Sequence, residues 1–240
     1  MCKDNYFCRM KNPVIRFVET TSSTNLEMSE IIKYNKLNNI VMDDFYALYA
    51  GYQTQGRGVA GNSWQSEANE NILISFYFSV PLHPAKQFAF NQFFSLSVRK
   101  MIAQYTPNAT IKWPNDIYVD NKKIAGILIE HTWQHDKILH TIAGVGINVN
   151  QTHFPSSVPN PVSLKLLTEK EFDIRAVISE LMNAGYEYYP YLTCQNFAFL
   201  NKEYLQYLYM LNEERYYKIK EEETKAKIAG VNEFEQLVFL

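Results

Sequence analysis

Cysteine and an excess of charge of one sign are scarce in this chain of 240 residues. Its 3 cysteines, Cys2, Cys8 and Cys194, are an odd number at spacings that suit neither a disulfide framework nor a zinc site, so we expect reduced thiols. The net charge of −2 leaves no basic field of the kind that binds nucleic acid. The composition therefore argues against a disulfide scaffold, a zinc protein and a nucleic-acid partner.

Long hydrophobic runs are also absent. The longest, from Ile72 to Leu82 with Ser75 and Ser79 inside it, is far short of the ~20 residues that cross a bilayer. The beginning of the chain, MCKDNYFCRMKN, has polar residues throughout its length and lacks the apolar segment of a secretory signal. We therefore expect a cytoplasmic protein without a membrane partner.

The hydrophobic fraction of 47% and the length suit one substantial domain with a small appendage. Runs rich in β-branched and aromatic residues predict strands, and apolar residues at helical spacing predict helices. Strands are expected at 13–18, 45–52, 71–80, 116–119, 122–132 and 137–149, and helices at 86–105, 174–192 and 197–211. This order, with a helix also after the first strand, predicts an α+β fold whose mixed sheet has helices on one side.

The pattern changes near residue 212. Residues 213–240 contain the short strand-like pieces RYYKIK, KAKIAG and QLVFL. They predict a small β domain. We therefore divide the chain into a main domain at 1–212 and a small domain at 213–240.

Glycine is scarce, and seven of the 9 glycines lie between positions 51 and 146. Since glycine lets the backbone turn sharply or approach a ligand closely, this region should carry the chemistry. Its first motif, GYQTQGRGVAGNSW at 51–64, combines backbone N–H groups with the cation of Arg57, which suits an anion. It lacks the Gly-Lys-Ser/Thr of a P-loop, and an ordinary hairpin loop is the alternative.

The second motif is KWPNDIYVDNKKIAGILIE at 112–130. Pro114 interrupts the strand, so Asn115 and Asp116 should lie on irregular backbone that can face a ligand. The segment DNKK at 120–123 predicts a hairpin turn.

Strand alternation after that turn places Lys123 on the same face as Ile127, and Gly126 on the opposite face. A lysine on an otherwise apolar face is costly unless it meets an anion. The alternative is a surface lysine beside a sheet edge.

Three shorter patterns are less specific. GVGINVN at 144–150 lacks the last glycine of a dinucleotide fingerprint, although close backbone approach remains open. In SSTNLE at 22–27, Thr24 and Glu27 have the spacing of a helix capping box, which is the alternative to a binding role. His131 and His135 are four residues apart but have no evident third ligand, so we expect no metal site there.

Taken in order, STN, YQTQGRG with a following W, KWPND, KKIAGIL.E and GVGIN resemble the motifs of the biotin protein ligase family, in its monofunctional type without an N-terminal DNA-binding domain. The resemblance covers about 14–150 through these motifs. It implies an α+β catalytic domain followed by a small SH3-like β domain, which looks incomplete here.

The resemblance also implies an activity. Members activate biotin with ATP as biotinyl-5′-AMP and transfer it to a lysine of a biotin carboxyl carrier protein, as biotin-[acetyl-CoA-carboxylase] ligases. The implied substrates are therefore ATP and biotin with Mg²⁺, the implied partner is the carrier domain of biotin-dependent carboxylases, and the expected state is a monomer or homodimer.

Carried over by motif, the resemblance implies two sets of binding residues. The set for biotin is Ser23, Thr24, Asn25, Gln53, Gly56, Arg57, Gly58, Lys123 and Gly126. The set for ATP or the adenylate is Arg57, Trp64, Lys112, Asn115, Lys123 and Asn148, with Trp64 stacking on adenine and Asp116 holding Mg²⁺. Arg57 and Lys123 are the catalytic candidates, because two fixed cations stabilise the charge where carboxylate meets α-phosphate.

One departure and two alternatives remain. Family loops commonly read GRGRxGRxW, whereas Val59 and Asn62 stand here in place of two arginines, which predicts weaker retention of the adenylate. A lipoate or octanoate ligase shares the fold and adenylation chemistry, but KWPND with Trp64 argues against it. A non-catalytic biotin-binding or carrier-docking module is the other alternative, and the presence of Arg57 and Lys123 weighs against it.

Overall fold

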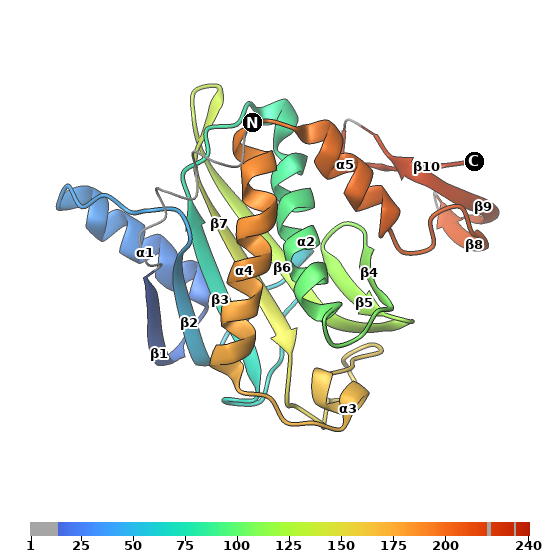
Figure 1. Cartoon of the computed structure of the whole chain (residues 1–240), viewed down its shortest axis with the longest axis horizontal. Helices are drawn as coiled ribbons and strands as arrows, with labels where there is room; N and C mark the ends of the chain where they lie inside the picture. Colours follow the sequence, from blue (N-terminus) through green and yellow to red (C-terminus); the bar gives the residue numbers. More distant parts are fainter. Residues whose placement is uncertain (1–13, 220–221, 233) are drawn as a thin grey trace.

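A seven-stranded mixed sheet forms the centre of the protein, in a computed structural model that describes residues 14–219, 222–232 and 234–240 (Figure 1). Along the sheet the strands follow the order β1-β2-β3-β7-β6-β5-β4. Their bounds are β1 (Ile15–Thr21), β2 (Tyr46–Gln53), β3 (Asn71–Phe78), β4 (Ala109–Lys112), β5 (Asp116–Val119), β6 (Lys122–Gln134) and β7 (Lys137–Asn148). The pair β1–β2 is parallel and the other neighbouring pairs are antiparallel, so the expected mixed sheet is confirmed.

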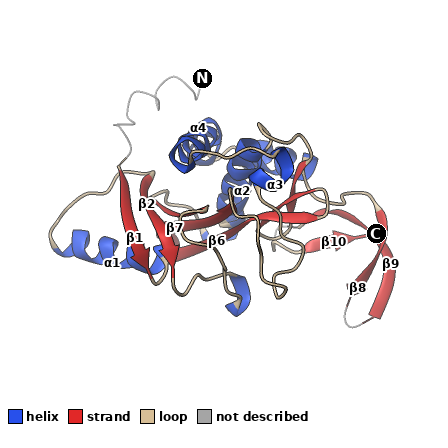
Figure 2. Ribbon diagram, turned by 90° about the horizontal axis from the view of Figure 1, so that it is seen from below, coloured by secondary structure: helices blue, strands red, loops and turns tan. Residues whose placement is uncertain are grey.

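The long helices α2 (Phe88–Ile102) and α4 (Ile174–Thr193) cover one face of this sheet, as Figure 2 shows. The aromatic residues of α2 interlock with those of β3 in edge-on pairs, such as Phe90 with Phe78. Such pairs add to the free energy gained from burial alone. The predicted α+β class is confirmed, but the expectation that the helices lie on one side is wrong, because helix α1 (Thr24–Leu37) packs on the other face.

Helix α1 (Thr24–Leu37) packs on the opposite face. Its residues Met28 and Ile31 form a second, smaller hydrophobic cluster with Leu48 of β2 and Ile142 of β7. The start of α1 thus lies over the middle of the sheet, beside the glycine-rich parts of β6 and β7. The remaining helices are α3 (Leu164–Thr168), α5 (Phe197–Gln206) and the 3₁₀ turns η2 (Val59–Gly61) and η3 (Pro84–Lys86).

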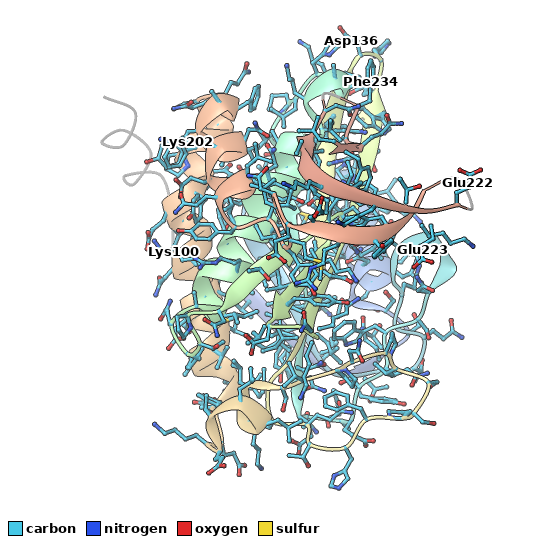
Figure 3. All side chains as sticks on the ribbon, turned by 90° about the vertical axis from the view of Figure 1, so that its right-hand side faces the viewer. Lys100, Asp136, Lys202, Glu222, Glu223 and Phe234 are labelled. Atoms are coloured by element: carbon cyan, nitrogen blue, oxygen red, sulfur yellow. The ribbon has the colours of Figure 1, made fainter. Side chains whose placement is uncertain are left out.

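A separate three-stranded sheet follows α5, built from β8 (Glu214–Ile219), β9 (Glu222–Val231) and β10 (Leu237–Phe239). It agrees with the small β domain expected at the end of the chain, and Figure 3 shows Glu222 and Glu223 at its outer end. The indole Nε1 of Trp113 donates to the carbonyl oxygen of Glu235 at 2.9 Å, and Ile228 belongs to the main core. The small sheet is therefore anchored on the KWPND segment.

Two local expectations are wrong. Helix α1 has Ser23 rather than Thr24 as its N-cap, without a side-chain capping bond, so there is no capping box. Cys194, at the end of α4, is disulfide-bonded and not a reduced thiol. The N-terminal segment 1–13, where no secretory signal is expected, lies outside the described residues.

No helix in the described part of the chain is long and apolar enough to span a bilayer.

His131 gives the fold a pH-dependent stability. It packs beside Phe90 and Trp133, its Nδ1 lies 2.9 Å from Thr141 Oγ1, and burial lowers its pKa from 6.5 to about 4. The unfolded chain therefore binds this proton more readily, so the contribution is complete above pH 6.5 and is lost as the pH falls to about 4. We expect the free energy of unfolding in urea to fall by about 2–3 kcal/mol across this window.

The variant His131→Gln should flatten that part of the pH profile. His153→Gln, at an exposed position, is the control and should keep it. An identical slope in all three proteins would contradict a neutral, partly buried His131.

Candidate active site

The site lies on a face of the sheet that glycine keeps free of side chains. Gly126 of β6 is paired with Gly146 of β7, and Gly144 is the next residue along β7 on the same face. A methyl group on Gly146 would lie 2.3 Å from Cε2 of Trp64, and one on Gly144 would lie 2.3 Å from Oδ1 of Asn25. Both distances are far below van der Waals contact, so these glycines create the space in which Trp64 and Asn25 lie.

Lys123 points to this same face, which corrects the prediction from strand alternation. The pairing of β5 with β6 shifts by one residue, so that Ile117 pairs with Ala125 but Tyr118 pairs with Lys123. Ile124 is the extra residue of this β-bulge and is fully buried. The bulge therefore returns Lys123 to the face of Gly126, where its Nζ would lie 3.3 Å from a Cβ on that glycine.

The loop 51–64 folds back on itself to reach this face. Arg57 pairs with Ser63 in an isolated β-bridge, and the backbone N–H of Trp64 donates to the carbonyl of Gly56 at 2.9 Å. A Cβ on Gly56 would lie 2.4 Å from the Trp64 carbonyl oxygen, so only glycine fits there. The hairpin alternative thus holds for the backbone, and the loop still delivers Arg57 and Trp64 to the site.

The first cavity lies between this loop, the start of α1, and strands β6 and β7. Its walls contain every residue of the set predicted for biotin except Gly56, namely Ser23, Thr24, Asn25, Gln53, Arg57, Gly58, Lys123 and Gly126. Asn25 and Gly144 are 119 positions apart in the sequence, and they meet at this cavity because β7 runs beneath α1. The spatial grouping of this set is therefore a property of the fold.

A hydrogen-bonded network forms the polar wall of the first cavity. The carboxamide Oε1 of Gln53 accepts from the backbone N–H of Thr24 at 2.7 Å. The buried hydroxyl of Ser75 lies 2.7 Å from Thr24 Oγ1 and 2.6 Å from Asn25 Oδ1. Because buried polar groups that are fully paired are held rigidly, this wall is formed before any ligand arrives.

Both catalytic candidates are held by carboxylates. Nη2 of Arg57 lies 3.0 Å from Oε1 of Glu130, and Nζ of Lys123 lies 2.7 Å from Oδ1 of Asp116. The Arg57 and Glu130 side chains are 43% and 34% exposed, so their attraction is worth no more than about 1 kcal/mol. A substrate anion can therefore replace the carboxylate at modest cost.

A second cavity of about 500 Å³ adjoins the first. It is lined by Lys112, Tyr118 and Asn148 together with the segment 154–161, and its size falls within the ~300–1,000 Å³ usual for ligand sites. The ammonium of Lys112 donates to the Tyr118 hydroxyl at 3.0 Å, which directs the cation along β5. Five residues line both cavities: Asn62, Ser63, Trp64, Asp116 and Lys123.

The set predicted for ATP divides between the two cavities. Lys112 and Asn148 line the second, whereas Asn115 lines the first and its Nδ2 donates to the carbonyl of Ile127 at 2.7 Å. Asn115 thus ties the KWPND segment to β6, and its expected contact with the nucleotide stays a prediction. Trp64 lies on the border, with the Lys123 ammonium 5.7 Å from its ring centroid.

Sequence patterns assigned no role to Ser75, Tyr118 or Glu130, although each contacts a predicted site residue. Glu130 is the last residue of the second motif, and its position there indicates no role. The signal for Tyr118 was its place two residues after Asp116, which puts both on one face of β5. Ser75 had no signal, since one serine in an apolar strand is unremarkable.

The KWPND block with the glycine loop and the paired glycines of β6 and β7 is matched by a known family pattern. The family model described as "Biotin/lipoate A/B protein ligase family" matches residues 18–148, which is more than half of the chain. The chain belongs to this family.

Individual members of the family resemble the chain over part of their length. A bifunctional ligase/repressor BirA from Bacillus spizizenii is 32% identical over 138 residues, which cover 55% of this chain and 42% of that protein. A biotin–[acetyl-CoA-carboxylase] ligase from Mycobacterium tuberculosis is 31% identical over 145 residues, covering 58% and 52%. The chain thus spans about half, or less, of the length of these curated relatives.

A solved structure extends the likeness to nearly the whole fold. The biotin protein ligase from Aquifex aeolicus in complex with biotin and ATP has a TM-score of 0.73 and 25% identity, covering 95% of this chain and 91% of that one. The match includes the region of the small three-stranded sheet, since so little of either chain is left out.

The glycine-cleared face can be tested by restoring single methyl groups. Gly146→Ala places a methyl group 2.3 Å from the Trp64 ring and should lower the free energy of unfolding by about 1–3 kcal/mol. Gly126→Ala is the matched comparison, because its methyl group would meet Trp64 at 2.9 Å and the flexible end of Lys123 at 3.3 Å. Urea unfolding should rank Gly146→Ala as the more damaging, and equal stability of both variants with the parent would contradict the packing described.

Proposed function

We propose that this protein is an ATP-dependent biotin–protein ligase, which forms biotinyl-5′-AMP and then transfers the biotinyl group to a lysine of a biotin carboxyl carrier domain. The observation that carries the proposal is the junction of two cavities at one cation. Lys123 lines both, with Arg57 on the side of the first and Lys112 on the side of the second. A reaction that joins two anionic substrates needs this arrangement of charge.

The first step joins the two substrates across that junction. A carboxylate oxygen of biotin, in the first cavity, attacks the α-phosphorus of ATP, in the second, and the bond from the α-phosphorus to the bridging oxygen breaks. Pyrophosphate leaves with that electron pair. Arg57 and Lys123 stabilise the negative charge that gathers between carboxylate and phosphate, because fixed cations in a preformed site need no reorganisation.

The second step uses the product of the first. The neutral amine of an acceptor lysine attacks the acyl carbon of the mixed anhydride, AMP leaves, and the amine loses its proton. AMP is a good leaving group because its phosphate carries the departing charge. The acceptor in this proposal is a carrier domain, as for the relative named a biotin–[acetyl-CoA-carboxylase] ligase.

The identity of the acid rests on the first cavity. Its polar residues Thr24, Asn25 and Gln53 line this cavity together with Trp64, whose indole lies against Gly126 and Gly146. The cavity therefore offers a polar ring both hydrogen-bonding groups and a flat aromatic surface. The Aquifex aeolicus relative was solved with biotin and ATP, which supports biotin as the acid and ATP as the nucleotide here. The polar wall supports biotin over the apolar tails of lipoate and octanoate.

Mg²⁺ fits this site only as a companion of ATP. Within the described residues there is no group of three or more His, Cys, Asp or Glu side chains that could hold a metal. Asp116 has one oxygen engaged by Lys123, and its carboxylate leaves a second oxygen at the border of the cavities. A single carboxylate together with phosphate oxygens is a usual Mg²⁺ environment, so Asp116 would hold the ion that ATP brings and help neutralise its phosphates.

The proposal is tested by pyrophosphate release with three acids in turn. With ATP present, we expect release with biotin and at most background release with lipoate and octanoate. Release that is fastest with lipoate or octanoate would favour the other branch of the family. Biotin binding without any release would favour a non-catalytic module.

Removing either catalytic cation should slow adenylate formation without unfolding the protein. We expect Arg57→Ala and Lys123→Ala each to lower the rate by ~10²–10³, since each removes charge stabilisation from a preformed site. Lys100→Ala is the control, because Lys100 pairs with Glu187 on the outer helices. Single-turnover pyrophosphate release measures the effect, and an unchanged rate in a folded variant would remove that residue from the mechanism.

Val59 offers a test of adenylate retention. It is 39% exposed and lines the first cavity beside Gly58, where an arginine could reach the phosphate. A charge-assisted contact of about 1.5–3 kcal/mol would make Val59→Arg release the adenylate ~10- to 100-fold more slowly and label fewer bystander proteins.

Val59→Gln is the matched control, because it is long and polar but uncharged. A chase experiment on preformed adenylate measures the dissociation rate. If arginine and glutamine have the same effect, charge at position 59 does not govern retention.

A further inference from the structure

Glu130 links two parts of the site that lie far apart in the sequence. It lies on β6, on the same face as Gly126 and Leu128. Its Oε1 lies 3.0 Å from Nη2 of Arg57, and its Oε2 accepts a hydrogen bond from Nδ2 of Asn25 at 2.7 Å. One carboxylate therefore joins the 51–64 loop to the first turn of α1.

The bond to Asn25 decides how its carboxamide is oriented. An ionised carboxylate only accepts hydrogen bonds, so the NH₂ group of Asn25 must face Glu130 and its oxygen must face Ser75. The short contact of 2.6 Å between Ser75 Oγ and Asn25 Oδ1 agrees with this orientation. The reversed carboxamide would set two acceptors against each other at Glu130.

The hydrogen-bonded network continues beyond Asn25, because Ser75 also contacts Thr24 Oγ1, and Thr24 contacts Gln53. The polar wall of the first cavity is thus continuous from Gln53 to Glu130. Arg57 is attached to the end of this network by the other oxygen of the same carboxylate.

Arg57 is the residue that gains most from such an attachment. A guanidinium on a long, half-exposed side chain loses conformational entropy when it is fixed on a ligand. Glu130 removes part of that cost in advance by holding the guanidinium at the edge of the first cavity.

We propose that Glu130 is a positioning residue, which sets the carboxamide of Asn25 and the guanidinium of Arg57 in one geometry before the acid binds. The inference rests on the function proposed above and concerns the same cavity. An opposing effect is that Glu130 competes with the acid for Arg57. The exposure of this ion pair makes that competition weak, so positioning dominates.

The variant Glu130→Gln keeps the shape of the side chain but has one acceptor oxygen, so it cannot serve Asn25 and Arg57 together. We expect the KM for biotin to rise ~10- to 100-fold in pyrophosphate release, the scale of a lost hydrogen bond to a charged group. Glu130 does not line the second cavity, so the KM for ATP should change by less than about threefold. A general loss of structure would raise the KM for biotin and the KM for ATP alike.

Two further variants separate geometry from charge. Glu130→Asp keeps the charge but is one methylene shorter, so positioning predicts a defect similar to that of Glu130→Gln. Glu187→Gln is the control and removes the ion-pair partner of Lys100. Figure 3 shows Lys100 away from the small β sheet. This variant should leave the KM values for biotin and for ATP unchanged. Normal biotin KM in Glu130→Asp, or tighter binding in Glu130→Gln, would overturn the proposal in favour of simple charge balance.

A double-mutant cycle tests the coupling itself. Effects of Glu130→Gln and Asn25→Ala on biotin affinity, measured by calorimetry, should be less than additive, whereas Glu130→Gln and Lys112→Ala should add. Additive effects for the Glu130–Asn25 pair would overturn the proposal.

Urea unfolding of the same Glu130 and Asn25 variants measures their coupling without any substrate. The two substitutions could prove coupled in unfolding while the parent protein releases no pyrophosphate. That result would overturn the proposed function and leave the positioning role of Glu130 intact. Additivity in unfolding would overturn the positioning, whatever the protein catalyses.

Discussion

The site depends on the absence of side chains from one face of paired strands. Gly126 and Gly146 stand opposite each other, and Gly144 continues the row, so the indole of Trp64 and the carboxamide of Asn25 rest directly on the backbone. A single methyl group at 144 or 146 would overlap these side chains. The loop, the start of α1 and the two cavities all take their places relative to this bare face.

The site also depends on the β-bulge at Ile124. Without it, Lys123 would point into the core with Ile127, and the second cavity would lose the cation that it shares with the first. The bulge also places Asp116 and Tyr118 beside Lys123 on the same face. One inserted residue thus turns Lys123 away from the core and places it where it lines both cavities.

Charge in the site is balanced before substrates bind. Arg57 is paired with Glu130, and Lys123 with Asp116. Each pair keeps its cation in place, and the more exposed pair, Arg57 with Glu130, is weak enough to be exchanged. When the substrates of the proposed reaction bind, their carboxylate and phosphates therefore meet cations that the protein already holds in place.

Much of this could be predicted from the sequence, because local patterns carry it. The strand 116–119 and the turn after it match the structure, as do the long helices and most of the residues around the first cavity. The face of Lys123 was predicted wrongly, since a bulge depends on the partner strand and leaves no mark on alternation. Ser75 and Glu130 went unassigned because their partner Asn25 is 50 and 105 residues away, a distance that only the folded chain closes.

The most direct test of the central claim is to mix the protein with biotin and ATP, without any acceptor protein, and to identify by mass spectrometry the small molecule that co-elutes with it. If the two cavities hold the acid and the nucleotide on either side of Lys123, biotinyl-5′-AMP will be recovered with the protein and pyrophosphate will be found free. Recovery of unchanged biotin and ATP from a folded protein would contradict the account.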